Sequence, residues 1–143
     1  MRTLAHISDL HFGTEIPAAV NGILAALAEI RPNLVVVSGD FTQRARDWQF
    51  AEAQRFLDQI QAPKLIVPGN HDIPLFNIWD RFFNPTERYR RFISPDLAPI
   101  FQDGEMIVLG INTARSLTRK NGRVSHQQMQ LIRDCFCAAP PNI

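Results

Sequence analysis

Three apolar segments, each ending in a polar cluster and separated from the next by a helical pattern, limit how this chain can fold more than any other feature. The segments span residues 4–7, 34–37 and 65–67. The second is an unbroken, valine-rich run, which is typical of a strand buried on both faces of a parallel sheet. Strands that alternate with helices imply right-handed crossovers between parallel neighbours. The sequence therefore predicts an α/β fold with a mostly parallel sheet flanked by helices.

The sequence indicates the helices between these strands through a proline at the start of the first and through the spacing of apolar residues in both. Pro17 is expected to open the first helix, because the missing N–H of proline costs nothing in the first turn. Apolar residues then recur at helical spacing: Val20, Ile23, Leu24, Leu27 and Ile30. The second helix is expected to carry one apolar stripe, formed by Phe50, Ala53, Leu57 and Ile60.

After residue 72 the alternation of strand and helix stops. Residues 76–93 are predicted to be helical or irregular. Their aromatic side chains are expected to pack in the core or in a lid rather than to stack on nucleic-acid bases: Phe76, Trp79, Phe82, Phe83, Tyr89 and Phe92. Residues 98–102 and 106–111 are predicted to pair as a hairpin around Asp103-Gly104, a strong turn pair.

The last part of the chain is predicted to be a polar loop over residues 112–124 and then a helix. Ser125 is expected to cap that helix, with Gln128 completing a capping box. Cys135 and Cys137 lie two positions apart on the same helix. Their side chains would diverge there, so we expect two reduced thiols rather than a disulfide.

Size and composition fit one soluble domain spanning residues 1–143, with 45% hydrophobic and 20% charged side chains. The formal net charge of +1 argues against tight binding to nucleic acid, which usually needs a basic surface. No apolar stretch approaches membrane-spanning length, and residues 1–7 are too short for a signal-peptide core. We therefore expect a cytoplasmic protein with no membrane partner.

The polar clusters stand at the predicted carboxyl ends of the three strands. They are Asp9-Leu10-His11, Gly39-Asp40 and Gly69-Asn70-His71-Asp72. In a parallel α/β sheet the ligand crevice lies at that edge, so clusters far apart in sequence should converge in space. Taken alone, each cluster is better explained as loop polars or helix caps. Their joint position favours a functional site.

The residue types in these clusters suit metal ions. Asp9 and His11 would point to one side of an extended chain, ready to hold one ion. Asp40 has two oxygens and can bridge two ions, and Asn70 offers a neutral carbonyl oxygen to the second. Carboxylate, imidazole and amide ligands without thiolate suit manganese, iron or zinc better than copper. His6, inside the first strand, is expected to be a core histidine rather than a ligand.

The ordered trio Asp-x-His, Gly-Asp and Gly-Asn-His-Asp resembles the calcineurin-like metallophosphoesterases. The resemblance implies the N-terminal portion of an α-β-β-α sandwich, and a hydroxide held by two divalent metal ions (Mn, Fe or Zn) that attacks phosphorus in line. It assigns Asp9 and His11 to the first metal, Asp40 to the bridge and Asn70 to the second metal. His71 would donate a proton to the leaving oxygen or stabilise transition-state charge, and Asp72 would orient His71.

The segment Ile111-Asn112-Thr113-Ala114-Arg115, followed by Gly122 and the helix start at Ser125, resembles the cyclic-nucleotide-phosphodiesterase-like (class III) branch of that family. This resemblance implies a phosphodiesterase acting on a small nucleotide-like or glycerophosphodiester substrate. It gives Arg115 a phosphate contact. The arginines at 88, 90 and 91 read instead as a solvated helix face.

Family members complete the site with a later histidine and a C-terminal Gly-His-x-His motif, which this sequence does not contain. Its histidines outside the clusters are His6 and His126. The resemblance thus covers a domain that would be incomplete at its C-terminus. The alternative function is a catalytically impaired metal-binding fragment, or half of an assembly, with self-association through an uncovered sheet.

Overall fold

The computed structural model describes residues 2–117 and 121–140. The strand–helix alternation comprises β1 (Leu4–Ile7), α1 (Pro17–Ile30), β2 (Leu34–Ser38), α2 (Asp47–Asp58) and β3 (Lys64–Val67). The remaining elements are α3 (Ile78–Phe83), α4 (Glu87–Phe92), β4 (Ile100–Gln102), β5 (Ile107–Leu109) and α5 (His126–Cys137). Parts of the predicted polar loop (118–120) and of the chain end (141–143) lie outside the described residues.

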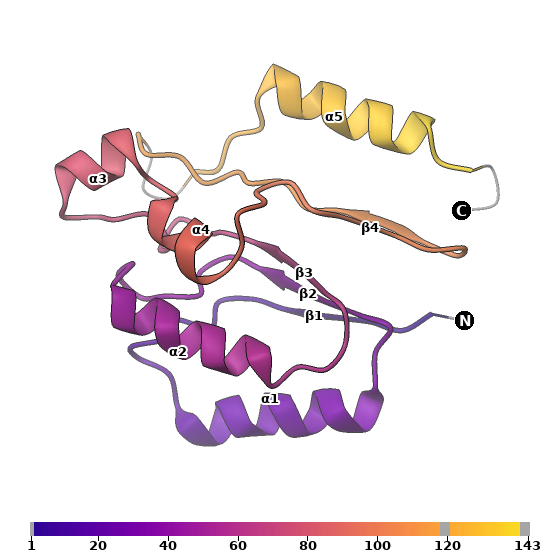
Figure 1. The fold of residues 1–143 in the computed structure, drawn as a ribbon, viewed down its shortest axis with the longest axis horizontal. Helices are drawn as coiled ribbons and strands as arrows, with labels where there is room; N and C mark the ends of the chain where they lie inside the picture. Colours follow the sequence, from indigo (N-terminus) through magenta and orange to yellow (C-terminus); the bar gives the residue numbers. More distant parts are fainter. Residues whose placement is uncertain (1, 118–120, 141–143) are drawn as a thin grey trace.

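The three predicted strands form one parallel sheet in the order β1-β2-β3. Ile7 pairs with Val37 of β2, and Val37 pairs with Ile66 of β3. Since neighbours in a parallel sheet share a face, these three side chains point the same way. The α/β fold with a mostly parallel sheet is confirmed, and the carboxyl ends of all three strands meet at one edge (Figure 1).

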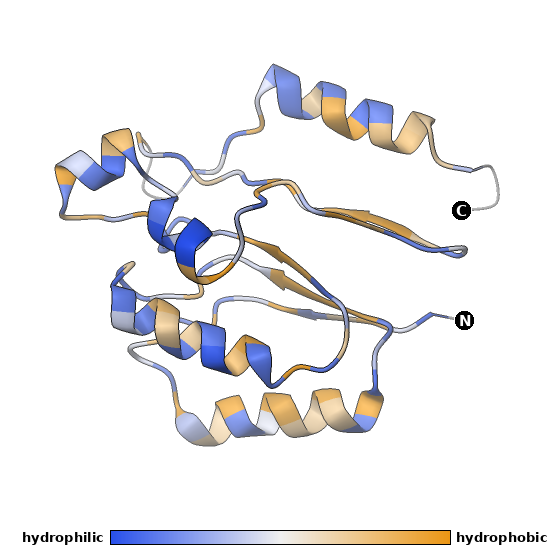
Figure 2. Ribbon diagram, in the orientation of Figure 1, coloured by the Kyte–Doolittle hydropathy of each residue, from blue (hydrophilic) through white to orange (hydrophobic). Residues whose placement is uncertain are grey.

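One face of the sheet carries the hydrophobic core. Val35 and Val37 are fully buried there against Phe50 and Phe56 of α2, and Leu27 of α1 joins the same cluster. Helices α1 and α2 cover this face (Figure 1), and the hydrophobic colour of the strands continues onto both helices (Figure 2). Burying several large apolar side chains, each worth roughly 1.5–3 kcal/mol, explains why this half of the molecule is well packed.

The chain directly after the predicted hairpin contacts the opposite face of the sheet at β3. β4 and β5 pair antiparallel, which confirms the hairpin. A side chain at Gly110, directly after β5, would meet Val67 and Leu65 of β3. Leu65 and Val67 alternate with the core-facing Ile66, so this contact lies on the face away from α1 and α2. Helix α5 lies beyond the hairpin (Figure 1).

The two predicted helix starts are confirmed. Pro17 occupies the first turn of α1. Ser125 caps α5, accepting a hydrogen bond from the backbone N–H of Gln128, whose side chain accepts one from the N–H of Ser125. Cys135 and Cys137 are free thiols, as expected. No helix within the described residues is long and apolar enough to cross a membrane.

The aromatic segment 76–93 divides into two kinds of residue. Tyr89 is fully buried, with its hydroxyl donating to the Ile66 carbonyl, and Phe92 stacks on Phe50. The other aromatic side chains do not pack in the core, because they lie between half and four-fifths exposed, and their packing in a lid stays a prediction: Phe76, Trp79, Phe82 and Phe83. Helical spacing does not distinguish an apolar side chain that packs from one that faces solvent.

Candidate metal centre

The loops that follow β1 and β2 run side by side and continue the parallel pairing of the sheet. The amides of Asp9 and His11 donate to the carbonyls of Gly39 and Asp40, at 3.2 and 2.9 Å. Phe12 then donates to Phe41 at 2.8 Å. These bonds bring the first and second polar clusters together, as the strand-end argument predicts.

The backbone at this junction differs from the expected extended chain. Asp9 and His11 have φ angles of +56° and +46°, and Asp40 has +53°. These values lie in the left-handed region, which non-glycine residues rarely adopt. The prediction that simple strand alternation aligns Asp9 with His11 is therefore wrong. Two tight bends, held by the loop pairing, align them instead, and such strained backbone is commonly found at functional sites.

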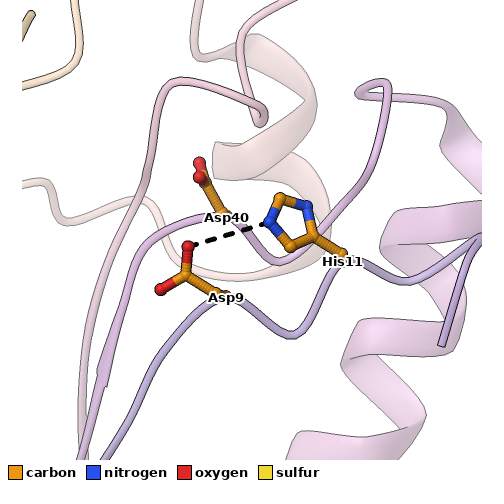
Figure 3. Close-up of side chains that lie close together, drawn as sticks. All are labelled: Asp9, His11 and Asp40. Atoms are coloured by element: carbon orange, nitrogen blue, oxygen red, sulfur yellow. Dashed lines mark ion pairs between the residues drawn. The ribbon is translucent and has the colours of Figure 1, made fainter. Parts of the chain in front are cut away.

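Asp9, His11 and Asp40 nevertheless converge. One ligand atom from each side chain lies within 4.8 Å of the other two. The Nε2 atom of His11 is 3.7 Å from a carboxylate oxygen of Asp9 (Figure 3). Two carboxylates and one imidazole form a donor set that suits divalent manganese, iron or zinc. The residues present therefore fit one divalent ion.

The third cluster, residues 69–72, holds the Asp40 side chain in place through the backbone of the cluster. The N–H of His71 donates to Oδ1 of Asp40 at 2.9 Å. The Cα of Gly69 lies 3.0 Å from where a Cβ on Gly39 would stand, and a Cβ on Gly69 would overlap the Asp40 carboxylate. The two glycines therefore allow the ends of β2 and β3 to approach closely enough for Asp40 to face the cluster.

A Gly69→Ala substitution should consequently weaken metal binding. Its methyl group would displace the Asp40 carboxylate, and disturbing the groups that orient a ligand typically costs about 10–100-fold in affinity. Calorimetric titration with Mn²⁺ measures the change. Gly22→Ala is the matched control, because a Cβ there meets nothing within 4 Å. Equal manganese affinity in the two variants would contradict this account of Gly69.

The imidazoles of His11 and His71 lie edge to face, with ring centroids 4.8 Å apart. The Nδ1 atom of His11 is buried and has no hydrogen-bond partner within the described chain. The ring is thus held by packing, with Nε2 turned to the carboxylate of Asp9. Nδ1 of His71 lies 3.0 Å from the Gln43 carbonyl. Because a carbonyl only accepts, this contact places a proton on Nδ1 and leaves Nε2 of His71 uncommitted.

Asp72 was predicted to orient His71, and its carboxylate is hydrogen-bonded to groups other than the His71 ring. The Asp72 carboxylate is buried and accepts hydrogen bonds from the backbone N–H groups of Phe41, Thr42 and Gly69 and from the Thr42 hydroxyl. Burial raises the pKa of Asp72 to about 6, although these donors oppose the rise. Asp72 therefore binds the loops after β2 and β3 to each other, and the Gln43 carbonyl is the group that orients His71.

Asn70 and Arg115 both line one polar pocket of about 350 Å³. Asp40, Thr113 and Gly122 line the same pocket. The Nη2 atom of Arg115 donates to the Arg123 carbonyl and to the Gln128 side chain, each at 2.8 Å. The contacts of Arg115 thus fix the start of α5. The phosphate contact implied for Arg115 and the ligand role of Asn70 stay predictions.

Two neighbours of the site carried no recognisable signal in the sequence. Thr42 and Gln43 directly follow Asp40, where polar residues are ordinary loop chemistry. Thr42 is fully buried and its hydroxyl also accepts from the Ala45 N–H. The expectation that His6 is a core residue is wrong, because His6 is exposed. Its Nε2 lies 2.6 Å from the Ser38 hydroxyl. His6 is not part of the Asp9, His11 and Asp40 cluster.

Comparison of the sequence with known protein families agrees with a metal centre formed by Asp9, His11 and Asp40. The profile of the calcineurin-like phosphoesterase family matches residues 2–134. A match over most of the chain, with the family's polar clusters meeting at one sheet edge, makes this chain a member of the calcineurin-like phosphoesterases. Members of this family are metal-dependent phosphoric ester hydrolases.

Two relatives to which part of the chain is similar are named as phosphodiesterases. The chain is 35% identical over 80 residues to the glycerophosphodiester phosphodiesterase GpdQ of Enterobacter lignolyticus, covering 48% of this chain and 29% of that protein. It is 29% identical over 69 residues to a probable cyclic nucleotide phosphodiesterase of Vesicomyosocius okutanii, covering 47% of this chain and 30% of that protein. Each match spans less than a third of the relative. Both are consistent with the class III branch.

Proposed function

We propose that this chain is the metal-binding part of a phosphodiesterase that hydrolyses a small nucleotide-like or glycerophosphodiester substrate with two divalent ions. The observation that carries the proposal is the convergence of Asp9, His11 and Asp40, whose ligand atoms lie within 4.8 Å of one another. The names of the two relatives supply the substrate classes.

Each residue of the centre has a separate task in this proposal. Asp9, His11 and Asp40 would hold the first ion, and Asp40 with Asn70 the second. When bound, such ions polarise the phosphoryl oxygen and activate water as the nucleophile. His71 would act as the imidazolium, in which Nδ1–H donates to the Gln43 carbonyl and Nε2–H is the proton transferred to the leaving oxygen.

The proposal is tested by metal-dependent hydrolysis. We expect the longest product of the reading frame to hydrolyse a glycerophosphodiester or a cyclic nucleotide when Mn²⁺ is supplied, and to lose that activity with a chelator. A phosphomonoester of the same alcohol should be a poorer substrate. Faster cleavage of the monoester would overturn the assignment to phosphodiesters.

A second candidate function, a metal-binding fragment with negligible turnover, is favoured by the histidine inventory. Outside the centre, the sequence holds only His6 and His126. His6 pairs with Ser38, and His126 is exposed in the first turn of α5. Neither supplies the later histidines that complete the site in the family, which leaves Asp40 and Asn70 alone for the second ion.

We therefore expect the 143-residue chain by itself to bind Mn²⁺ weakly and to hydrolyse phosphodiesters poorly. A second site with two protein ligands must fill its coordination shell with water, and without the second ion the clamp on both oxygens of the in-line displacement is lost. Hydrolysis of a chromogenic phosphodiester, measured beside any longer product of the reading frame, checks this. Comparable rates for the two would show that the short chain builds a working site in another way.

A further inference from the structure

One polar pair lies outside the metal centre, on the other side of the sheet from the core. Nε2 of His6, on β1, lies 2.6 Å from the hydroxyl oxygen of Ser38, the last residue of β2. His6 pairs in register with Val36, two positions before Ser38, so both side chains of the pair lie on the face away from α1 and α2. His6 is exposed and Ser38 is partly buried. The tasks proposed for the metal centre do not use this contact.

Ser38 also lines the polar pocket of about 350 Å³ beside the metal centre. The pocket meets that centre at Asp40 and Asn70, the residues proposed for the second ion. Within the described residues, His71 is not part of the pocket lining. A volume of this size is in the range of sites for small molecules. The pocket therefore begins at the position proposed for the second ion, and the proposed proton donor lies outside it.

Residues after β5 add further polar groups to the lining of this pocket. They include Thr113, Arg115 and Asn121. The N–H of Arg123 donates to the Thr113 carbonyl at 2.9 Å. A Cβ on Gly122 would stand 2.8 Å from Oγ1 of Thr113, so glycine allows the chain there to lie directly against this side chain. This part of the lining is thus held by backbone contacts, and its hydroxyl, guanidinium and amide groups suit a hydroxylated ligand.

The contact with His6 determines how the Ser38 hydroxyl is presented to the pocket. A serine hydroxyl has one donor and two acceptor positions, and it rotates to suit its partners. When Nε2 of His6 accepts the Ser38 proton, the Ser38 oxygen still accepts from a ligand. When Nε2 carries the proton and donates it, the Ser38 O–H is left to donate to a ligand. A ligand hydroxyl both donates and accepts, so it fits either tautomer of His6.

We propose that this pocket binds the alcohol that stays on phosphorus, and that Ser38, held by His6, hydrogen-bonds a hydroxyl of that alcohol. The proposal rests on the phosphodiesterase function proposed above. A diester has two ester oxygens, and His71 serves the one that leaves. Because His71 lies outside the pocket, the pocket is left to the retained alcohol. The substrate class is a diester whose retained alcohol is small and carries a free hydroxyl. Ser38 is then a specificity residue, and His6 is a positioning residue that acts through it.

Two diesters with the same leaving group test the proposal. They are the nitrophenyl phosphate diesters of glycerol and of propanol, which differ only in the hydroxyls of the retained alcohol. The longest product of the reading frame, supplied with Mn²⁺, should show the lower KM for the glycerol diester. Ser38→Ala should raise that KM by about 3–10-fold, the usual worth of one hydrogen bond. The kcat for both diesters and the KM for the propanol diester should stay unchanged.

His6 variants separate positioning from a general structural effect. His6→Phe should raise the KM for the glycerol diester in the same way, and it should add nothing in a double variant with Ser38→Ala, because the two residues act as one unit. His6→Gln, whose amide can still hydrogen-bond Ser38, should recover most of the preference for the glycerol diester. His126→Phe, at an exposed position in the first turn of α5, is the matched control and should leave both KM values unchanged.

Calorimetric binding of glycerol 3-phosphate and of propyl phosphate, with Mn²⁺ present, measures the same contact without turnover. The wild type should bind glycerol 3-phosphate more tightly, and Ser38→Ala should bind the two equally. If this difference in binding is found but no diester is hydrolysed, the proposed function fails and the hydroxyl contact stands.

Two results would overturn the pocket assignment and leave the proposed function intact. Hydrolysis of both diesters by the wild type with equal KM would show that the pocket does not bind a hydroxyl of the retained alcohol. A Ser38→Ala variant that unfolds at a lower temperature but keeps the wild-type preference for the glycerol diester would show that the contact with His6 only ties β1 to β2.

Discussion

Asp40→Asn is expected to remove metal and hydrolytic activity together. Ligand atoms of Asp9, His11 and Asp40 lie within 4.8 Å of one another. Asp40 is the one side chain assigned to both ions. The amide keeps the shape and can still accept from the His71 N–H, but it loses the negative charge that offsets two dications. We expect Mn²⁺ affinity to fall by more than about 100-fold, beyond the usual effect of altering a neighbour of a ligand.

Calorimetric titration and metal analysis after gel filtration measure this loss. Asp58→Asn, an exposed aspartate at the end of α2, is the matched control and should bind metal as the wild type does. Without metal, Asp40→Asn should unfold at the same temperature or higher, because the carboxylates of Asp9 and Asp40 repel each other across the cluster. A variant that retained the full manganese content would remove Asp40 from the bridging role.

His71→Asn is expected to lower turnover by about 10²–10⁴-fold while leaving metal content nearly unchanged. The imidazole is directed by the Gln43 carbonyl and lies beside His11, so it is placed to serve the reacting oxygen rather than to hold an ion. The loss should be larger for a diester with a poor leaving group than for a nitrophenyl ester. A leaving oxygen that is a strong base needs a proton most.

The comparison is best made in the longest product of the reading frame, where we expect turnover to be highest. His126→Asn, at an exposed position in the first turn of α5, controls for loss of any histidine. A His71→Asn enzyme with wild-type turnover on the poor leaving group would show that His71 transfers no proton. If metal content fell in step with turnover, His71 would instead support the metal centre through His11.

The sequence by itself determined the sheet and the meeting of its polar clusters. Valine-rich runs such as 34–37 can be satisfied only by burial on both faces, and helical crossovers then force the strands to run parallel. Asp9 and Asp40 each follow such a strand, so their convergence needs no detail of side-chain packing. The hairpin around Asp103 and the cap at Ser125 were also predictable from the sequence, because each depends on a few adjacent residues.

Only the tertiary structure decided how the clusters are held and what the remaining residues contact. The left-handed bends at Asp9 and His11 come from hydrogen bonds to the loop after β2, thirty residues away in the chain. The carboxylate of Asp72 accepts hydrogen bonds from the N–H groups of Thr42 and Phe41, because a buried carboxylate needs several donors to stabilise it. The exposure of Trp79 was likewise beyond sequence reasoning. Whether an apolar side chain is covered depends on which distant element packs over it, and local spacing does not carry that information.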